Sequence, residues 1–211
     1  MSATAKRGEV NLRDSLSQLS GIWSKITSLF QGKHELVWKD NLAPMIGGKG
    51  AEMAEPDLVA ALGGIYFPQF APNIIEEAMA FFHINHDIAR NSLVYPHIHW
   101  SPSDANAGTV RWGFEYAVLQ RDVGNTSATT TIYLEDTANG NAGIRNQVVE
   151  ATEAQAFTAP EVDSLVVARI FRDATHANDT YASDAIGLFG DLHYQAEMSG
   201  TPQKAADFYR R

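Results

Sequence analysis

Alternation of apolar and polar residues dominates the sequence between residues 65 and 200. Val110, Trp112 and Phe114 occupy every second position of one stretch, so a strand there would carry all three on one face. Comparable stretches, separated by turn-forming residues, are predicted as strands at 94–100, 109–120, 129–135, 144–149, 162–172 and 185–197. Short strands without a long helix between them predict a mainly β protein, an antiparallel β-sandwich of the jelly-roll type.

A different pattern occupies residues 1–33. Apolar residues recur there at intervals of three and four, which predicts an amphipathic helical arm. The members of this seam are Leu12, Leu16, Leu19, Trp23, Ile26 and Phe30. The seam either packs against its own domain, or forms a short coiled coil that joins and anchors copies of the chain.

Residues 34–64 are rich in glycine and small side chains. This composition predicts a flexible linker between the arm and a sandwich domain over 65–200. Within the linker, residues 55–62 have a composition that would allow one or two helical turns. The last stretch, 201–211, is predicted as a C-terminal tail.

The chain has 211 residues, a net charge of −9 and no cysteine. The charge argues against nucleic acid or an anionic membrane as a partner. The lack of cysteine excludes disulfides and thiolate chemistry. The arm differs, since residues 1–33 carry five basic and two acidic side chains. No run reaches the ~20 apolar residues of a membrane helix, and no signal core precedes the arm, so synthesis in a cytoplasm is expected.

Histidines supply the candidate chemistry. In a strand, His97 and His99 point to the same side and could chelate one metal ion, with Glu115 of the following strand as the carboxylate ligand. Asp191 and His193 form another pair on one face of a late strand. A set of His97, His99, Glu115 and His193 would suit a cupin-like metal-dependent enzyme. The acidic residue that cupins place after the second histidine, and their second motif, are missing.

The opposing interpretation makes the same region structural. The stretch 94–116 then forms a strand, a turn-rich loop and a strand, a hairpin whose core contains His97, His99, Trp112 and Tyr116, either within the sandwich or at a subunit contact. On this interpretation no metal or cofactor is bound. His83 and His86 are interpreted as an ordinary polar pair near a turn.

A third interpretation is a carbohydrate-binding module for host attachment. Trp100, Trp112 and Tyr66 could stack on sugar rings, although strand alternation would more simply bury them. No nucleophile elbow and no paired catalytic carboxylates occur in the sequence. We therefore expect no enzymatic activity.

The histidine-rich region also carries a resemblance. It reads Tyr95-Pro96-His97-Ile98-His99-Trp100, and further characteristic runs follow at 108–116, 169–173, 179–181 and 191–195. Together they resemble a family of tailed-bacteriophage and prophage virion structural proteins, over roughly residues 65–200. The resemblance implies a non-enzymatic particle component in the head decoration, neck or tail apparatus.

These expectations combine into one prediction. The protein would be made in the host cytoplasm and located in the virion. It would assemble with itself as a homo-oligomer, most simply a trimer, around one symmetry axis. Its other partners would be phage capsid, portal or tail proteins, to which the basic arm could bind.

Overall fold

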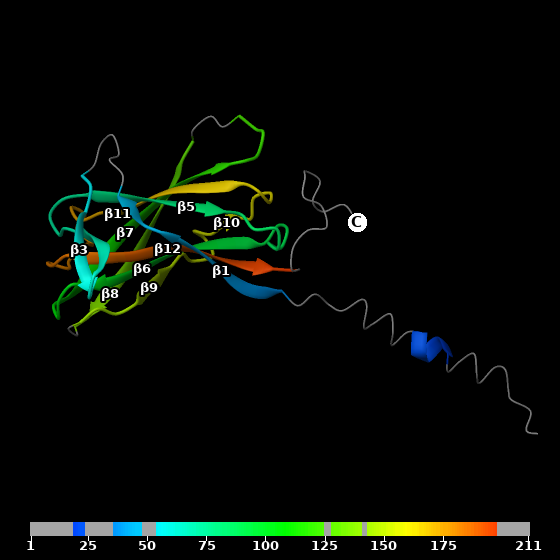
Figure 1. Ribbon diagram of the computed structural model, residues 1–211, viewed down its shortest axis with the longest axis horizontal. Helices are drawn as coiled ribbons and strands as arrows, with labels where there is room; N and C mark the ends of the chain where they lie inside the picture. Colours follow the sequence, from blue (N-terminus) through cyan, green and yellow to red (C-terminus); the bar gives the residue numbers. More distant parts are fainter. Residues whose placement is uncertain (1–18, 24–35, 48–53, 125–127, 141–142, 198–211) are drawn as a thin grey trace, which may run out of the picture. The chain divides into compact units, whose positions relative to one another are not determined.

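The computed structural model describes residues 19–23, 36–47, 54–124, 128–140 and 143–197. From Leu36 onward the chain forms a unit of its own, in which two antiparallel sheets pack face to face (Figure 1). The seven-stranded sheet contains β1 (Val37–Pro44), β3 (Asp57–Leu62), β4 (Ile65–Phe70), β6 (Leu93–Pro102), β9 (Gln147–Glu150), β10 (Phe157–Thr158) and β12 (Ala185–Ala196). The five-stranded sheet contains β2 (Ile46–Gly47), β5 (Glu76–His83), β7 (Ala107–Leu119), β8 (Thr130–Asn139) and β11 (Leu165–Arg172).

Strand order identifies the sandwich as a jelly roll. One sheet has the central order β1-β12-β6-β9 and the other the order β5-β11-β7-β8. The chain therefore crosses between the sheets from β1 to β2, β2 to β3, β4 to β5, β5 to β6, β6 to β7, β8 to β9, β10 to β11 and β11 to β12. This pattern of crossings builds the two interlocked Greek keys of that fold. The predicted antiparallel β-sandwich is confirmed.

Aromatic side chains from both sheets fill the core. Trp100 of β6 and Trp112 of β7 pack edge to face with ring centroids 6.1 Å apart, and Phe70 packs on Trp112 at 5.1 Å. Edge-to-face pairs of this kind add to the free energy that burial alone provides. Val110, Trp112 and Phe114 are all fully buried, so the alternation predicted for this strand is confirmed.

The strands on either side of the loop at 103–106 do not form a hairpin, so this part of the prediction was wrong. β6 and β7 belong to different sheets, and the loop is a corner that carries the chain from one to the other. The physical reason lies in the core. Trp100 and Trp112 contact each other from opposite sheets, so the two strands face each other across the sandwich instead of pairing edge to edge.

The predicted linker over 34–64 was also wrong, because it contains β1, β2 and β3. β1 pairs along β12, and the chain then places Met45 in the core. Met45 fills the space over Gly187, where an added Cβ would meet its sulfur at 2.6 Å. Residues 55–62 hold strand β3 instead of helical turns, and Gly63, with a φ of 60°, turns the chain into β4.

Little of the helical arm lies within the described residues. Residues 19–23 are helical, with Leu19 and Trp23 exposed. The other seam residues, Leu12, Leu16, Ile26 and Phe30, lie outside the described part. The predicted tail at 201–211 also lies outside it. The helical seam therefore stays a prediction.

Within the described part, no helix has the length and apolar character needed to cross a membrane.

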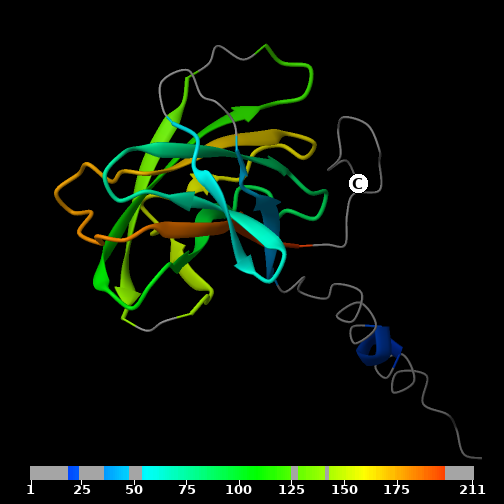
Figure 2. The ribbon, with the colours of Figure 1, turned by 60° about the vertical axis from the view of Figure 1, so that its left-hand side comes forward.

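A buried arginine closes one end of the sandwich. Arg172, at the end of β11, is fully buried and donates from Nε and Nη2 to the two carboxylate oxygens of Asp179, at 3.0 and 2.7 Å. Its remaining hydrogens reach the backbone carbonyls of Ser183, at 2.8 Å, and of Phe70 and Tyr181. These bonds fix the loop between β11 and β12, drawn in orange in Figure 2, against the end of both sheets.

We predict that Arg172→Met lowers the free energy of unfolding by about 3–5 kcal/mol, because it leaves the Asp179 carboxylate buried without its cation. Chemical denaturation of the full chain measures this change. Arg121→Met is the matched control, since Arg121 forms ion pairs with Asp122 and Asp163 at the surface and should change stability by less than about 1 kcal/mol. Equal effects of the two substitutions would contradict the assignment.

Candidate functional site

The outer face of the seven-stranded sheet carries the histidines singled out in the sequence. Ile98 and Trp100 of β6 point into the core and are fully buried. Neighbouring residues of a strand point to opposite faces, so His97 and His99 point outward. The register with the adjoining strands places Glu150 of β9 on one side of His97 and Asp191 of β12 on the other.

His97 is the centre of this arrangement. Only 7% of its surface is exposed, although it lies on the outer face of the sheet. Its Nε2 lies 2.9 Å from Oε1 of Glu150, and its Nδ1 lies 3.8 Å from Oδ2 of Asp191. Despite the short distance to Glu150, Nε2 is not aligned for a hydrogen bond and has no such partner among the described residues.

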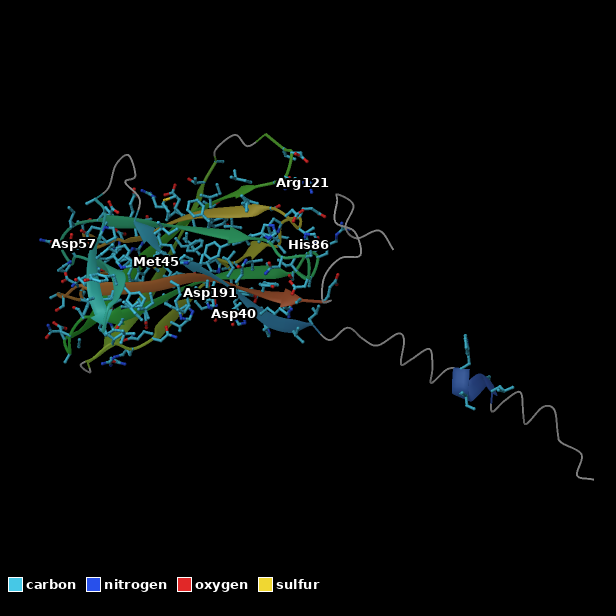
Figure 3. All side chains as sticks on the ribbon, viewed as in Figure 1. Asp40, Met45, Asp57, His86, Arg121 and Asp191 are labelled. Carbon is cyan, nitrogen blue, oxygen red and sulfur yellow. The ribbon has the colours of Figure 1, made fainter. Side chains whose placement is uncertain are left out.

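Two further imidazoles complete what we term the histidine cluster, which consists of His97, His99, His193, Asp40, Glu150 and Asp191. His193 places Nδ1 3.5 Å from Glu150 Oε1 and Nε2 3.8 Å from Asp40 Oδ1. His99 Nδ1 donates to Asn146 Oδ1 at 2.8 Å, and its Nε2 lies 3.8 Å from Asp191 Oδ2. Figure 3 labels Asp40 and Asp191, which lie close together on β1 and β12.

The cluster combines three imidazoles with three carboxylates. Asp191 is almost fully buried, and its Oδ1 accepts the backbone N–H of Asn41 at 2.9 Å. A buried carboxylate needs donors or a cation to offset its desolvation. The backbone N–H of Asn41 and the imidazoles of His97 and His99 offset part of the desolvation of Asp191. Protons on the imidazoles or a bound metal ion could offset the rest.

Glu115, predicted as the carboxylate of a metal site, is not part of the cluster. It lies on β7 in the other sheet, where Arg169 and Thr129 donate to it. The hydrogen bond from Thr129 and the Arg169 guanidinium hold the pKa of Glu115 below its usual range, against the effect of partial burial. The predicted set of His97, His99, Glu115 and His193 is therefore wrong in its carboxylate and brings together only the three histidines.

The structure also places the predicted core residues. Trp112 lies in the core and Tyr116 packs against it, whereas His97 and His99 face outward, so a position of these two histidines at a subunit contact stays a prediction. The carbohydrate platform was wrong, because Trp100 and Trp112 are fully buried and Trp100 Nε1 donates to Asp136 at 2.9 Å. Tyr66 alone of that set is exposed.

An apolar surface surrounds the cluster on the same face. Trp38 packs against His193 at a centroid distance of 4.7 Å and Phe189 stacks on His99 at 4.1 Å. Beyond Phe189 lies a hollow of about 360 Å³. Its walls are Leu62, Phe67, Ile144, Arg145, Asn146, Leu188 and Phe189. The face therefore has a polar centre and an apolar border.

A second histidine group lies at the C-terminal end of β5. His86 Nε2 lies 2.9 Å from Oδ1 of Asp163 and His83 Nε2 lies 3.3 Å from the same oxygen, with Arg121 3.3 Å from the other oxygen. The hydrogen bond with His86, with the nearby His83 and Arg121, holds the pKa of Asp163 below its usual range. The two histidines thus share one carboxylate, a link that sequence spacing did not indicate.

Sequence reasoning missed Glu150, Asp40 and Asn146. Each comes from a strand or loop distant in sequence from His97, and each is brought close by strand register. The only signal available was the pairing of Asp191 and His193 on one face of a strand, which the structure confirms as neighbours in the cluster.

Comparisons with known proteins give a distant likeness among solved structures. No family model matches the chain, and no curated protein matches it. Among solved structures, the chain is similar to the Eiger TNF from S. frugiperda, with 14% identity over 79% of this chain and 99% of that chain. The TM-score is 0.29, and the likeness carries no statement about function.

We predict that Asp163→Asn reduces stability at pH 5 and has a smaller effect at pH 2.5. The folded state depresses the pKa of Asp163, so its contribution is present above about pH 4 and is lost as pH falls through the folded value. Urea unfolding at the two pH values measures the gap between wild type and variant. Asp122→Asn, at an exposed carboxylate, is the control, and a gap that does not change with pH would contradict the assignment.

Proposed function

We propose that this protein is a non-enzymatic structural component of a tailed-phage virion, and that its copies assemble through the outer face of the seven-stranded sheet. The observation that carries the proposal is the apolar border of that face. Trp38 and Leu42 of β1 are 51% and 59% exposed, and Val148 of β9 is also exposed. Large apolar side chains gathered on one face of a β-sandwich are typical of a surface that another protein covers.

A second copy of the chain is the partner that the charges favour. Copies of a protein with a net charge of −9 repel one another unless the surfaces in contact carry both signs. On the outer face of the seven-stranded sheet, imidazoles lie between the carboxylates of the histidine cluster, and an imidazole can donate a hydrogen bond to a carboxylate and gains a positive charge when it is protonated. Such a surface can be complementary to a copy of itself.

The outer face of the five-stranded sheet has a different character. Arg169 spans Glu77 and Glu115 there, and Arg111 spans Glu135 and Asp173. These ion pairs within the chain already meet the needs of their charged groups, so this face has less to gain from contact. Both sheets expose apolar side chains, Phe81 and Leu165 among them on the five-stranded sheet, so it is the difference in charged groups that favours the seven-stranded sheet as the contact face.

The virion role rests on the resemblance of residues 65–200 to phage structural proteins. The residues that carry it include Ile98 and Trp100, which build the core, and His97 and His99, which build the outer face. The basic arm at residues 1–33 is proposed to anchor the assembly on an acidic capsid, portal or tail surface. We propose the virion as its location, and neither nucleic acid nor a membrane as its partner.

We predict a solution mass near 69 kDa, three times the 23.1 kDa of one chain, in light scattering of the full chain. Leu42→Glu should raise the dissociation constant by roughly 30-fold, because it places a charge among apolar contacts at a loss of about 2 kcal/mol. Phe81→Glu is the matched control, since Phe81 is similarly exposed on β5 in the other sheet. A monomer, or an oligomer broken by the Phe81 substitution and not by the Leu42 substitution, would contradict the contact face.

The virion role has its own test. Mass spectrometry of purified phage particles should find this chain in a fixed copy number, because a structural component occupies symmetric positions. A chain present in the infected lysate and absent from purified particles would contradict the role and leave the contact face untouched.

A further inference from the structure

Three buried ring nitrogens of the histidine cluster have no hydrogen-bond partner among the described residues. They are Nε2 of His97, Nε2 of His99 and Nδ1 of His193. A buried polar atom without a hydrogen-bond partner lowers the stability of the folded state, so most such atoms in proteins are satisfied by protein, water or an ion. Two of them, on His97 of β6 and His193 of the adjoining β12, point to a ligand that they share.

Two of these nitrogens converge on one carboxylate oxygen. Glu150 Oε1 lies 2.9 Å from Nε2 of His97 and 3.5 Å from Nδ1 of His193. Ligands bound to zinc at roughly 2.0–2.2 Å lie about 3.3 Å from one another in a tetrahedral site. These two distances are close to the spacing that one metal ion requires. One ligand atom from each of the three residues lies within 4.8 Å of the other two, and the residues come from three adjoining strands.

A carboxylate lies near the second ring nitrogen of each of these two imidazoles. Nδ1 of His97 lies 3.8 Å from Oδ2 of Asp191, and Nε2 of His193 lies 3.8 Å from Oδ1 of Asp40. In metal sites the second ring nitrogen of a ligating histidine usually faces a carboxylate or carbonyl, which fixes the tautomer and makes the ligating nitrogen more basic. Asp191 is itself fixed by the backbone N–H of Asn41.

We propose that His97 Nε2, His193 Nδ1 and Glu150 Oε1 bind one divalent transition metal ion of the zinc class, with water in the remaining position. Two imidazoles and one carboxylate favour zinc and its neighbours over calcium or magnesium, which prefer oxygen. The side chains of Glu150 and His193 are 48% and 27% exposed, so an ion can enter from solvent.

The alternative ligand set of His97, His99 and Asp191 fits less well. Both imidazoles lie 3.8 Å from the Asp191 carboxylate, which is wider than a tetrahedral site requires. All three side chains of this set are nearly buried, so an ion from solvent would reach it less readily than it would reach His97, His193 and Glu150. His99 therefore serves as the discriminating residue between the two sets.

All three proposed ligands belong to one chain. The metal site therefore does not depend on assembly, and a monomer that binds zinc would support it while contradicting the proposed contact face. The competing explanation is an ionic cluster, in which protonated imidazoles pair with the carboxylates and no metal is bound.

Calorimetric titration of the full chain with Zn²⁺, after removal of metal by a chelator, tests the proposal. We expect one ion per chain, a raised midpoint of thermal unfolding and, with Co²⁺ as the probe, visible absorption from nitrogen and oxygen ligands. Glu150→Gln and His193→Gln should each weaken binding by more than about 100-fold, beyond the roughly 10–100-fold caused by losing a partner outside the ligand set. Both residues are partly exposed, so the variants should fold.

Two histidine variants serve as controls. His176→Gln, in the loop between β11 and β12, should leave zinc affinity unchanged. His99→Gln, which removes a neighbour of Asp191, should weaken binding far less than Glu150→Gln or His193→Gln, by no more than about tenfold. Absence of binding to the wild-type chain would overturn the proposal in favour of the ionic cluster. Loss of binding in His99→Gln but not in His193→Gln would overturn the proposed ligand set.

Discussion

The alternation of side chains along β6 is the constraint on which the rest of the structure depends. Ile98 and Trp100 must be buried, because Trp100 meets Trp112 across the sandwich. Burying them turns His97 and His99 to the outside of the seven-stranded sheet. A shift of one residue in register would exchange the two sets, and it would expose the tryptophan and bury two imidazoles in the core.

The outer face that results has two properties at once. Its centre is polar, because β9 and β12 bring Glu150 and Asp191 to either side of His97. Its border is apolar, with Trp38 and Leu42 presented by β1. A metal ion would use the centre and a second copy of the chain would use the border. The two proposals therefore follow from one arrangement of strands, and each can hold without the other.

Sequence patterns predicted the strands whose alternation is strong, such as 109–120, and from these the β-sandwich. They failed over residues 34–64, where β1 is held by pairing with the distant strand β12 and β3 by a hairpin with β4, instead of by their own composition. The same limit applies to the site. His97 and His193 could be named from the sequence, but the choice of Glu150 over Glu115 depends on which strands pair, and local patterns do not encode that pairing.

Hydroxyl-radical footprinting of the full chain tests most directly whether copies of the chain contact each other through the outer face of the seven-stranded sheet. The account predicts that oxidation of Trp38 and Leu42 is slower in the concentrated, assembled protein than after dilution, while Phe81 and Leu165, exposed on the other sheet, react equally in both. Protection of Phe81 and Leu165 with Trp38 and Leu42 unchanged, or equal reactivity of all four at both concentrations, would contradict it.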